Sequence, residues 1–152
     1  GVLVGMTASR NPARVVGIST RQPTDFQRKH ISSLAEKLAA FIKVPPPPAE
    51  TVVVRDEYVG PGYSLPTDGM AEALTLFART EGLLLDPVYS GKAAAGLIDL
   101  VRTGHFPEGS DVLFLHTGGA PSTYHYLPTP ISTVQSGTAS AEPQAKRARA
   151  AK

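Results

Sequence analysis

Hydrophobic and polar positions change period along the chain, and these changes predict strands that alternate with helices. Short β-branched runs at residues 14–19 and 51–54 are typical of buried strands. Between them, apolar residues recur every three or four positions over residues 24–43, which predicts an amphipathic helix. Thr24 and Gln27 match a capping box at its start. Four consecutive prolines end the helix and form a stiff connector to the second strand.

The next stretch of the chain predicts a loop and a second long helix. Residues 56–67 are interrupted by glycine and proline, which favours a loop over a regular element. A helix is predicted over residues 68–79, and Gly82 ends it. Its candidate core face consists of four apolar side chains: Met70, Ala73, Leu74 and Phe77.

The remaining elements complete an α/β order. Residues 83–85 are predicted as a short strand, residues 91–102 as a helix with Gly104 as its C-terminal cap, and residues 111–115 as the last strand. This order predicts an α/β fold with an open, mostly parallel sheet and flanking helices. Ligands of such sheets bind beyond the carboxyl ends of the strands, so the loops GPGY, DPVYSGK and HTGG are candidate site segments.

Composition narrows the class of protein. The chain has 152 residues, 41% of them hydrophobic, which is enough apolar material for a packed core. It contains no cysteine, which excludes disulfides, thiolate metal sites and cysteine nucleophiles. No apolar run is long enough to cross a membrane and no secretory signal is visible, so we predict a cytoplasmic protein without a membrane partner.

The positive charge is concentrated at the C-terminus. The net charge is +2, yet four basic residues and one acidic residue lie after Ile131, which leaves residues 1–130 near neutral. A nucleic-acid surface would carry its cations on the folded face, so we predict no nucleic-acid partner. We expect a folded domain over residues 1–130 and a disordered basic tail over residues 131–152.

Few residues suggest chemistry by spacing alone. The four histidines have no metal-ligand spacing, so no metal site is predicted. Tyr63 and Tyr89 each place a phenol in a loop, and their spacing alone favours ordinary half-buried tyrosines over site residues. The glycines of HTGG permit close backbone approach to a ligand, although a simple turn explains them equally well. Gly91-Lys92 is not part of a phosphate-binding P-loop, because the first glycine of that motif is missing upstream, and Lys92 is interpreted as structural.

Two stretches carry a specific resemblance. Residues 62–82, GYSLPTDGMAEALTLFARTEG, and residues 81–119, EGLLLDPVYSGKAAAGLIDLVRTGHFPEGSDVLFLHTGG, closely resemble the carboxyl-terminal part of D-cysteine desulfhydrases and 1-aminocyclopropane-1-carboxylate deaminases. These are pyridoxal-phosphate (PLP) enzymes of the tryptophan-synthase β type, fold type II. The resemblance runs from about Gly1 to Pro128, and DPVYSGK followed by HTGG is its most specific part.

The resemblance implies roles for six residues. Tyr63 and Tyr89 match the two family tyrosines that flank the substrate amino acid, and we take them as catalytic. Thr117 matches the residue at the pyridine nitrogen of PLP, and Gly118-Gly119 are its close-packed neighbours in the cofactor site. Ser90 belongs to the substrate pocket.

The same positions favour one branch of the family. Ser90 and Thr117 stand where the cyclopropane deaminases carry glutamate and leucine, so the chain looks more similar to the desulfhydrases. The implied activity is a PLP-dependent lyase reaction, the α,β-elimination of D-cysteine to pyruvate, sulfide and ammonia. The alternatives are a 1-aminocyclopropane-1-carboxylate deaminase-like enzyme and a non-catalytic binding module of the same fold.

The resemblance also implies parts that this sequence does not show. In the family, the Schiff-base lysine and the serine/glycine phosphate loop correspond to positions upstream of Gly1. The chain is therefore expected to be a fragment that is inactive alone, and Lys92 matches a non-catalytic family position. Family members are homodimers, so the resemblance implies a homodimer for the full-length protein. It also implies a small amino acid as the substrate.

Overall fold

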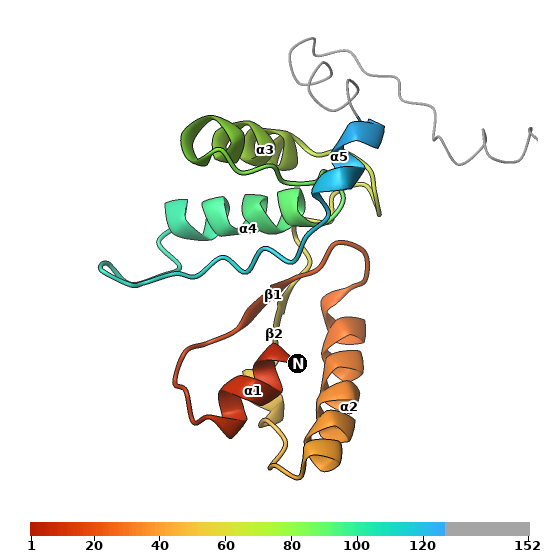
Figure 1. The fold of residues 1–152 in the computed structure, drawn as a ribbon, viewed down its shortest axis with the longest axis vertical. Coiled ribbons are helices and arrows are strands. Elements are labelled where there is room, and N and C mark those ends of the chain that lie inside the picture. The colour runs from red at the N-terminus through yellow and green to blue at the C-terminus, as the bar shows by residue number, and fades with distance from the viewer. Residues whose placement is uncertain (127–152) are drawn as a thin grey trace, which may run out of the picture.

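The computed structural model describes residues 1–126, in which a small parallel sheet lies between two groups of helices (Figure 1). Strand β1 (Val16–Ile18) pairs in parallel with β2 (Val53–Arg55), and Val16 lies opposite Val53. Both strands were predicted, although β2 begins two residues later because a short 3-10 helix, η1 (Ala49–Thr51), precedes it. The α/β class with parallel strands and flanking helices is confirmed, with two paired strands where four were predicted.

Two helices pack together on one side of the sheet. The short α1 (Val2–Ala8) was not predicted, whereas α2 (Thr24–Ile42) covers the predicted helix. Val4 of α1 packs against Ala35 and Ala39 of α2, where small side chains allow the helices to approach closely. Leu38 of α2 packs against the edge of this contact, whereas Phe41 lies outside it and is 84% exposed.

The predicted capping box at the start of α2 is wrong. Thr24 already belongs to the helix, and the cap residue is Pro23, whose side chain has no acceptor for the first N–H groups. A long-range contact takes the place of the capping box, because the backbone N–H of Thr24 donates to Oδ2 of Asp56 at 2.7 Å. The helix start is therefore tied to the loop that follows β2.

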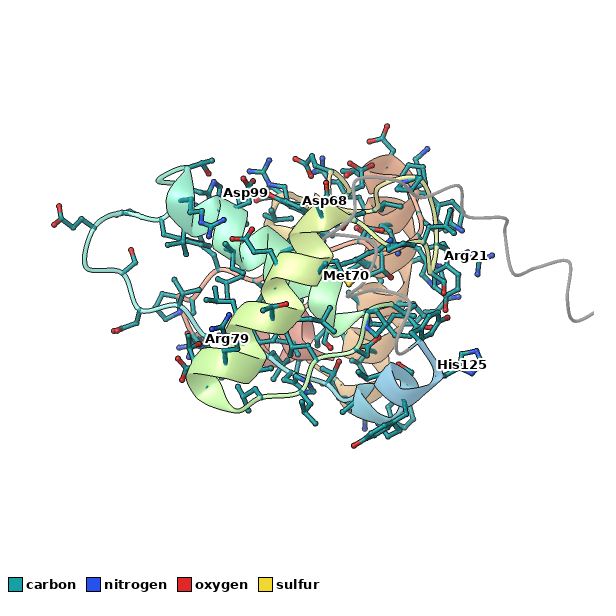
Figure 2. All side chains as sticks on the ribbon, turned by 90° about the horizontal axis from the view of Figure 1, so that it is seen from above. Arg21, Asp68, Met70, Arg79, Asp99 and His125 are labelled. Atoms are coloured by element: carbon teal, nitrogen blue, oxygen red, sulfur yellow. The ribbon has the colours of Figure 1, made fainter. Side chains whose placement is uncertain are left out.

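The main core lies between α3 (Asp68–Glu81) and α4 (Ser90–Arg102), which stack on the other side of the sheet (Figure 1). The predicted face of α3 is confirmed, with Phe77 packed against the edge of the core. Figure 2 looks down on this helix and labels Met70 in its first turn. The buried core comprises Met70, Ala73, Leu74, Leu85, Ala94 and Ala95.

Both ends of α3 follow from local chemistry. The Thr67 side chain accepts a hydrogen bond from the N–H of Met70 at 3.2 Å, which satisfies one of the free donors of the first turn. Gly82 caps the other end with a left-handed φ of 67°, as predicted. Gly104, just after α4, also has a left-handed φ of 68°, which agrees with its predicted place at the end of that helix.

The two other predicted strands are wrong. Residues 83–85 form no strand, because Leu85 turns into the α3–α4 core instead of pairing. Residues 111–115 run extended beneath α4 but pair with no strand in the part of the chain that the structure describes (Figure 1). Leu113 of this segment is 89% exposed.

A last helix, α5 (Ala120–Tyr126), was not predicted. It lies near the ends of α3 and α4, and the Thr123 hydroxyl donates to the carbonyl of Leu85 at 3.0 Å. The predicted tail over residues 131–152 falls outside the described residues. Within residues 1–126, no helix is both long enough and apolar enough to cross a membrane.

Candidate active site

The buried carboxylate of Asp86 organises the turn that opens α4. Its Oδ2 accepts hydrogen bonds from the backbone N–H groups of Val88 and Tyr89 at 2.9 and 2.8 Å. Its Oδ1 accepts from the backbone N–H and the hydroxyl of Ser90 at 2.8 and 2.6 Å. Burial alone would raise the pKa of this carboxyl, but the four hydrogen bonds outweigh burial and lower the pKa. Asp86 is therefore an ionised cap at the start of the helix.

Ser90 is part of this cap. Its hydroxyl donates to the Asp86 carboxylate and accepts from the backbone N–H of Asp86 at 2.8 Å, so the two residues satisfy each other reciprocally. The next residue must be glycine, because a Cβ on Gly91 would lie 2.7 Å from the carbonyl oxygen of Asp86. The Ser-Gly pair thus fits the turn for steric reasons, and the Ser90 hydroxyl points into the turn.

Tyr63 and Tyr89 meet above this turn. Tyr63 comes from the loop between β2 and α3, and its hydroxyl is hydrogen-bonded to that of Tyr89. The ring centroids are 6.0 Å apart, and the side chains are 42% and 50% exposed. The hydrogen bond to Tyr89 is the main reason why the pKa of Tyr63 is raised. Because both hydrogen-bonded phenols are exposed, a small ligand has access to them.

A cation lies over the Tyr63 ring. The guanidinium carbon of Arg21 is 5.3 Å from the centre of the Tyr63 ring, within the range of a cation–π contact. Arg21 follows β1 in the chain and lies on the side of α3 where the Tyr63 loop runs (Figure 2). The exposed tyrosine pair therefore has a positive charge beside it, which favours an anionic group on the ligand.

Lys92 is hydrogen-bonded to the backbone of the loop that carries Tyr63. It is completely buried, and its Nζ donates to the carbonyl oxygens of Val59 and Gly62 at 2.6 and 2.9 Å. Burial lowers the pKa of the Lys92 ammonium. The prediction of a structural Lys92 agrees with these contacts. The side chain is nevertheless buried, unlike most lysines at the start of a helix.

The HTGG segment reaches the same turn through its second glycine. Gly118 and Gly119 have positive φ angles of 109° and 97°, which favour glycine. A Cβ on Gly119 would lie 2.5 Å from Oδ1 of Asp86, whereas a Cβ on Gly118 would meet nothing within 4 Å. The N–H of Gly118 donates to Nδ1 of His116 at 3.2 Å.

The structure thus brings most of the predicted site residues to one place. Tyr63 contacts Tyr89, and both Ser90 and Gly119 lie against the Asp86 carboxylate. Thr117 is exposed beside the glycine pair, and its hydroxyl makes no hydrogen bond within residues 1–126.

Sequence reasoning missed Asp86 and Arg21. The signal for Asp86 was present, since an aspartate followed by proline just before a helix is a typical capping sequence. No local pattern marks Arg21, which reaches Tyr63 only through the fold.

Comparisons with known proteins show which family this chain is similar to. The family model described as pyridoxal-phosphate dependent enzyme matches residues 1–118. The chain is 44% identical over 127 residues to the 1-aminocyclopropane-1-carboxylate deaminase of Pseudomonas syringae pv. tomato, an alignment that covers 83% of this chain and 38% of the relative. The enzyme of the same name from Burkholderia vietnamiensis is 43% identical over the same share of both chains.

A solved structure of an ACC deaminase homologue is also similar. It superposes with a TM-score of 0.72 and 31% sequence identity, over 82% of this chain and 37% of that chain. The chain therefore spans a little over a third of the length of the relatives that it matches.

Proposed function

The chain belongs to the family of pyridoxal-phosphate dependent enzymes, as its sequence motifs predicted, and we propose that it supplies the substrate-facing side of a PLP active site. The observation that carries this proposal is the exposed, hydrogen-bonded phenol pair of Tyr63 and Tyr89, with Arg21 beside it. The site binds a small amino acid whose carboxylate interacts with these groups.

The glycine pair and Thr117 fit one end of the cofactor. Gly118 has no side chain and borders open space, so a flat ring can approach the backbone there. The exposed Thr117 hydroxyl offers a neutral hydrogen-bonding group for the pyridine nitrogen. Bound PLP would supply an electron sink for the substrate bond that breaks. The chain's own residues hold the ring and the substrate.

The tyrosine pair has two tasks in this proposal. One phenol donates a hydrogen bond to the substrate carboxylate, which the Arg21 guanidinium also attracts. The other phenol holds or moves a proton at its oxygen, because the hydrogen bond between the two hydroxyls gives a path along which a proton can pass.

The similarity to named relatives favours deamination of 1-aminocyclopropane-1-carboxylate as the first candidate reaction. Relatives of that name are 43–44% identical over most of this chain. The predicted desulfhydrase activity is the second candidate, supported by the neutral hydroxyls of Ser90 and Thr117. The Ser90 hydroxyl is neutral and donates to Asp86, so it places no charge beside the pyridine ring of the cofactor. This favours a reaction with a good leaving group such as the thiolate of D-cysteine.

Lys92 does not serve as the lysine that carries the cofactor in this proposal. Its ammonium is buried under two backbone carbonyls and is held away from the open side of the tyrosine pair. We therefore expect the chain alone to be inactive. We also expect a full-length enzyme containing it to form the predicted homodimer, which sedimentation analysis would test.

The proposal is tested in the full-length enzyme that contains this chain. Tyr89→Phe and Tyr63→Phe should each lower kcat/KM about 100-fold, because each removes a hydroxyl involved in proton transfer or carboxylate binding. Tyr124→Phe is the matched control, since Tyr124 is an exposed tyrosine on α5, and should change kcat/KM less than about twofold. Unchanged kcat/KM in both site variants, with normal PLP absorbance, would contradict the proposal.

The two candidate reactions are separated by their products. We expect 2-oxobutanoate from 1-aminocyclopropane-1-carboxylate with a higher kcat/KM than sulfide from D-cysteine. The reverse ratio would favour the second candidate, and release of neither product would exclude both.

A further inference from the structure

Two ionisable side chains are buried in the part of the chain that the structure describes, and they flank Tyr89 symmetrically in the sequence. Asp86 lies three residues before Tyr89 and Lys92 three residues after it, and both are 0% exposed. Asp86 fixes the backbone of Tyr89 through its hydrogen bond to the N–H of that residue at 2.8 Å. Lys92 makes no such contact with Tyr89, and its hydrogen bonds go to the Tyr63 loop instead.

The partners of Lys92 are neutral. Its Nζ donates to the carbonyls of Val59 and Gly62, and no carboxylate within residues 1–126 forms a salt bridge with it. Burying an ammonium without an opposite charge is unfavourable, and the two charge-assisted hydrogen bonds offset only part of this cost. A buried apolar residue of similar length would avoid the cost of burying a charge. We therefore look for the role of Lys92 in its two hydrogen bonds.

Those contacts fall on the residues that determine where Tyr63 lies. Gly62 directly precedes Tyr63, so the hydrogen bond to its carbonyl fixes the backbone from which the phenol extends. The bond to Val59 fixes the other side of the same turn. The loop has few other internal restraints: the N–H of Val59 donates to Asp56 and that of Leu65 to Gly62, at 3.1 and 3.3 Å.

We propose that Lys92 is a positioning residue that holds the Tyr63 phenol against Tyr89. The turn before α4 and the first turn of the helix then each carry an anchor for one tyrosine: Asp86 for Tyr89, and Lys92 for the loop that bears Tyr63. The inference deepens the proposed function, on which it rests, because the phenol pair is the centre of that site. The role requires donor hydrogens at Nζ, and the ammonium itself contacts neither substrate nor cofactor.

The test compares Lys92→Met with the wild-type chain and with Lys37→Met. Methionine has nearly the same length as lysine but no donor, and Lys37 is an exposed lysine of α2 that serves as control. Two measurements at neutral pH report on position without any catalysis. These are hydrogen exchange of the amides in residues 59–65 and the nuclear Overhauser effect between the rings of Tyr63 and Tyr89.

In Lys92→Met we expect loop exchange to accelerate about tenfold or more, because losing one hydrogen bond to a charged group changes an equilibrium by at least that factor. The ring-to-ring effect should disappear, while amides within α3 and α4 stay protected. Lys37→Met should match the wild type in every respect. Loop exchange within twofold of the wild type and a retained ring-to-ring effect would overturn the proposal.

Lys92→Arg covers the case in which Lys92→Met fails to fold. Arginine keeps the donors and the charge, so a folded Lys92→Arg should retain the ring-to-ring effect. Its loss in a chain with protected α3 and α4 would also overturn the proposal. These readouts are independent of turnover. If Lys92 positions Tyr63 but Tyr63→Phe has normal kcat/KM, the proposed function fails while the positioning role stands.

Discussion

The α3–α4 unit and the extended segment 111–115 are both rich in apolar residues, but the first buries them and the second buries mainly Phe114, which packs against the α3–α4 core. Met70 of α3 is completely buried against Leu85 and the small residues of α4, whereas Leu113 of the extended segment is 89% exposed. Helices α3 and α4 pack against each other, and both lie within one short stretch of sequence. A strand has to find a neighbouring strand, and in residues 1–126 β1 and β2 pair only with each other. An apolar pattern thus predicts a tendency to be buried, and the surrounding chain decides whether burial occurs.

The largest effect is expected at the cap of the buried unit. Asp86→Ala leaves three backbone N–H groups and the Ser90 hydroxyl without their acceptor. We expect the free energy of unfolding to fall by about 4 kcal/mol, since each unsatisfied buried donor costs about 1–3 kcal/mol. Urea unfolding would measure this loss. A loss below about 1 kcal/mol would show that water replaces the carboxylate and that the cap is not buried in solution.

The next effect concerns the core itself. Met70→Ala should lower the free energy of unfolding by about 3 kcal/mol, because it opens a cavity among fully buried side chains. Leu76→Ala is the control on the same helix, since Leu76 is 39% exposed and should cost clearly less. Equal losses in the two variants would mean that α3 does not bury the face seen in the structure.

A smaller effect depends on pH. The pKa of Asp86 is lowered in the folded chain by its hydrogen bonds, although burial opposes them. Its contribution to stability is therefore fully present above the unfolded pKa of about 3.9 and is lost as the pH falls through the lowered folded pKa. Thermal unfolding between neutral pH and the acid range should show this loss in the wild type and less of it in Asp86→Asn. An identical acid profile would place the carboxyl in solvent.

The smallest effect is expected in the extended segment. Leu113→Ser should change the free energy of unfolding by less than about 0.5 kcal/mol, because the side chain is already exposed to solvent. The same urea experiment measures it. A loss comparable to that of Met70→Ala would mean that residues 111–115 are covered in solution.

The sequence predicted the elements that a clear apolar period or turn residues mark. The buried face of α3, its glycine cap and the positions of β1 and β2 followed from apolar period and turn residues. The short helices α1 and α5 were missed, since seven residues carry little periodic signal. The capping box of α2 failed because a long-range bond from Thr24 to Asp56 takes its place.

Some residues of the candidate site could also be predicted from the sequence, and others could not. Tyr63 and Tyr89 were identified through family motifs, and the structure brings them into contact. Neither spacing nor composition reveals that Arg21 stacks on Tyr63, because helix α2 and strand β2 lie between them in the chain. The buried roles of Asp86 and Lys92 depend on what surrounds them, which a local pattern does not record.

Amide hydrogen exchange of the wild-type chain tests the contrast most directly. We expect strong protection for the N–H groups of Val88, Tyr89 and Ser90, which donate to the buried Asp86 carboxylate, and for the interior of α4. We expect the amides of residues 112–115 to exchange within about tenfold of the rate of an unfolded chain. Protection of residues 112–115 as strong as that of α4, or free exchange at Val88, Tyr89 and Ser90, would contradict this contrast between a buried cap and an exposed segment.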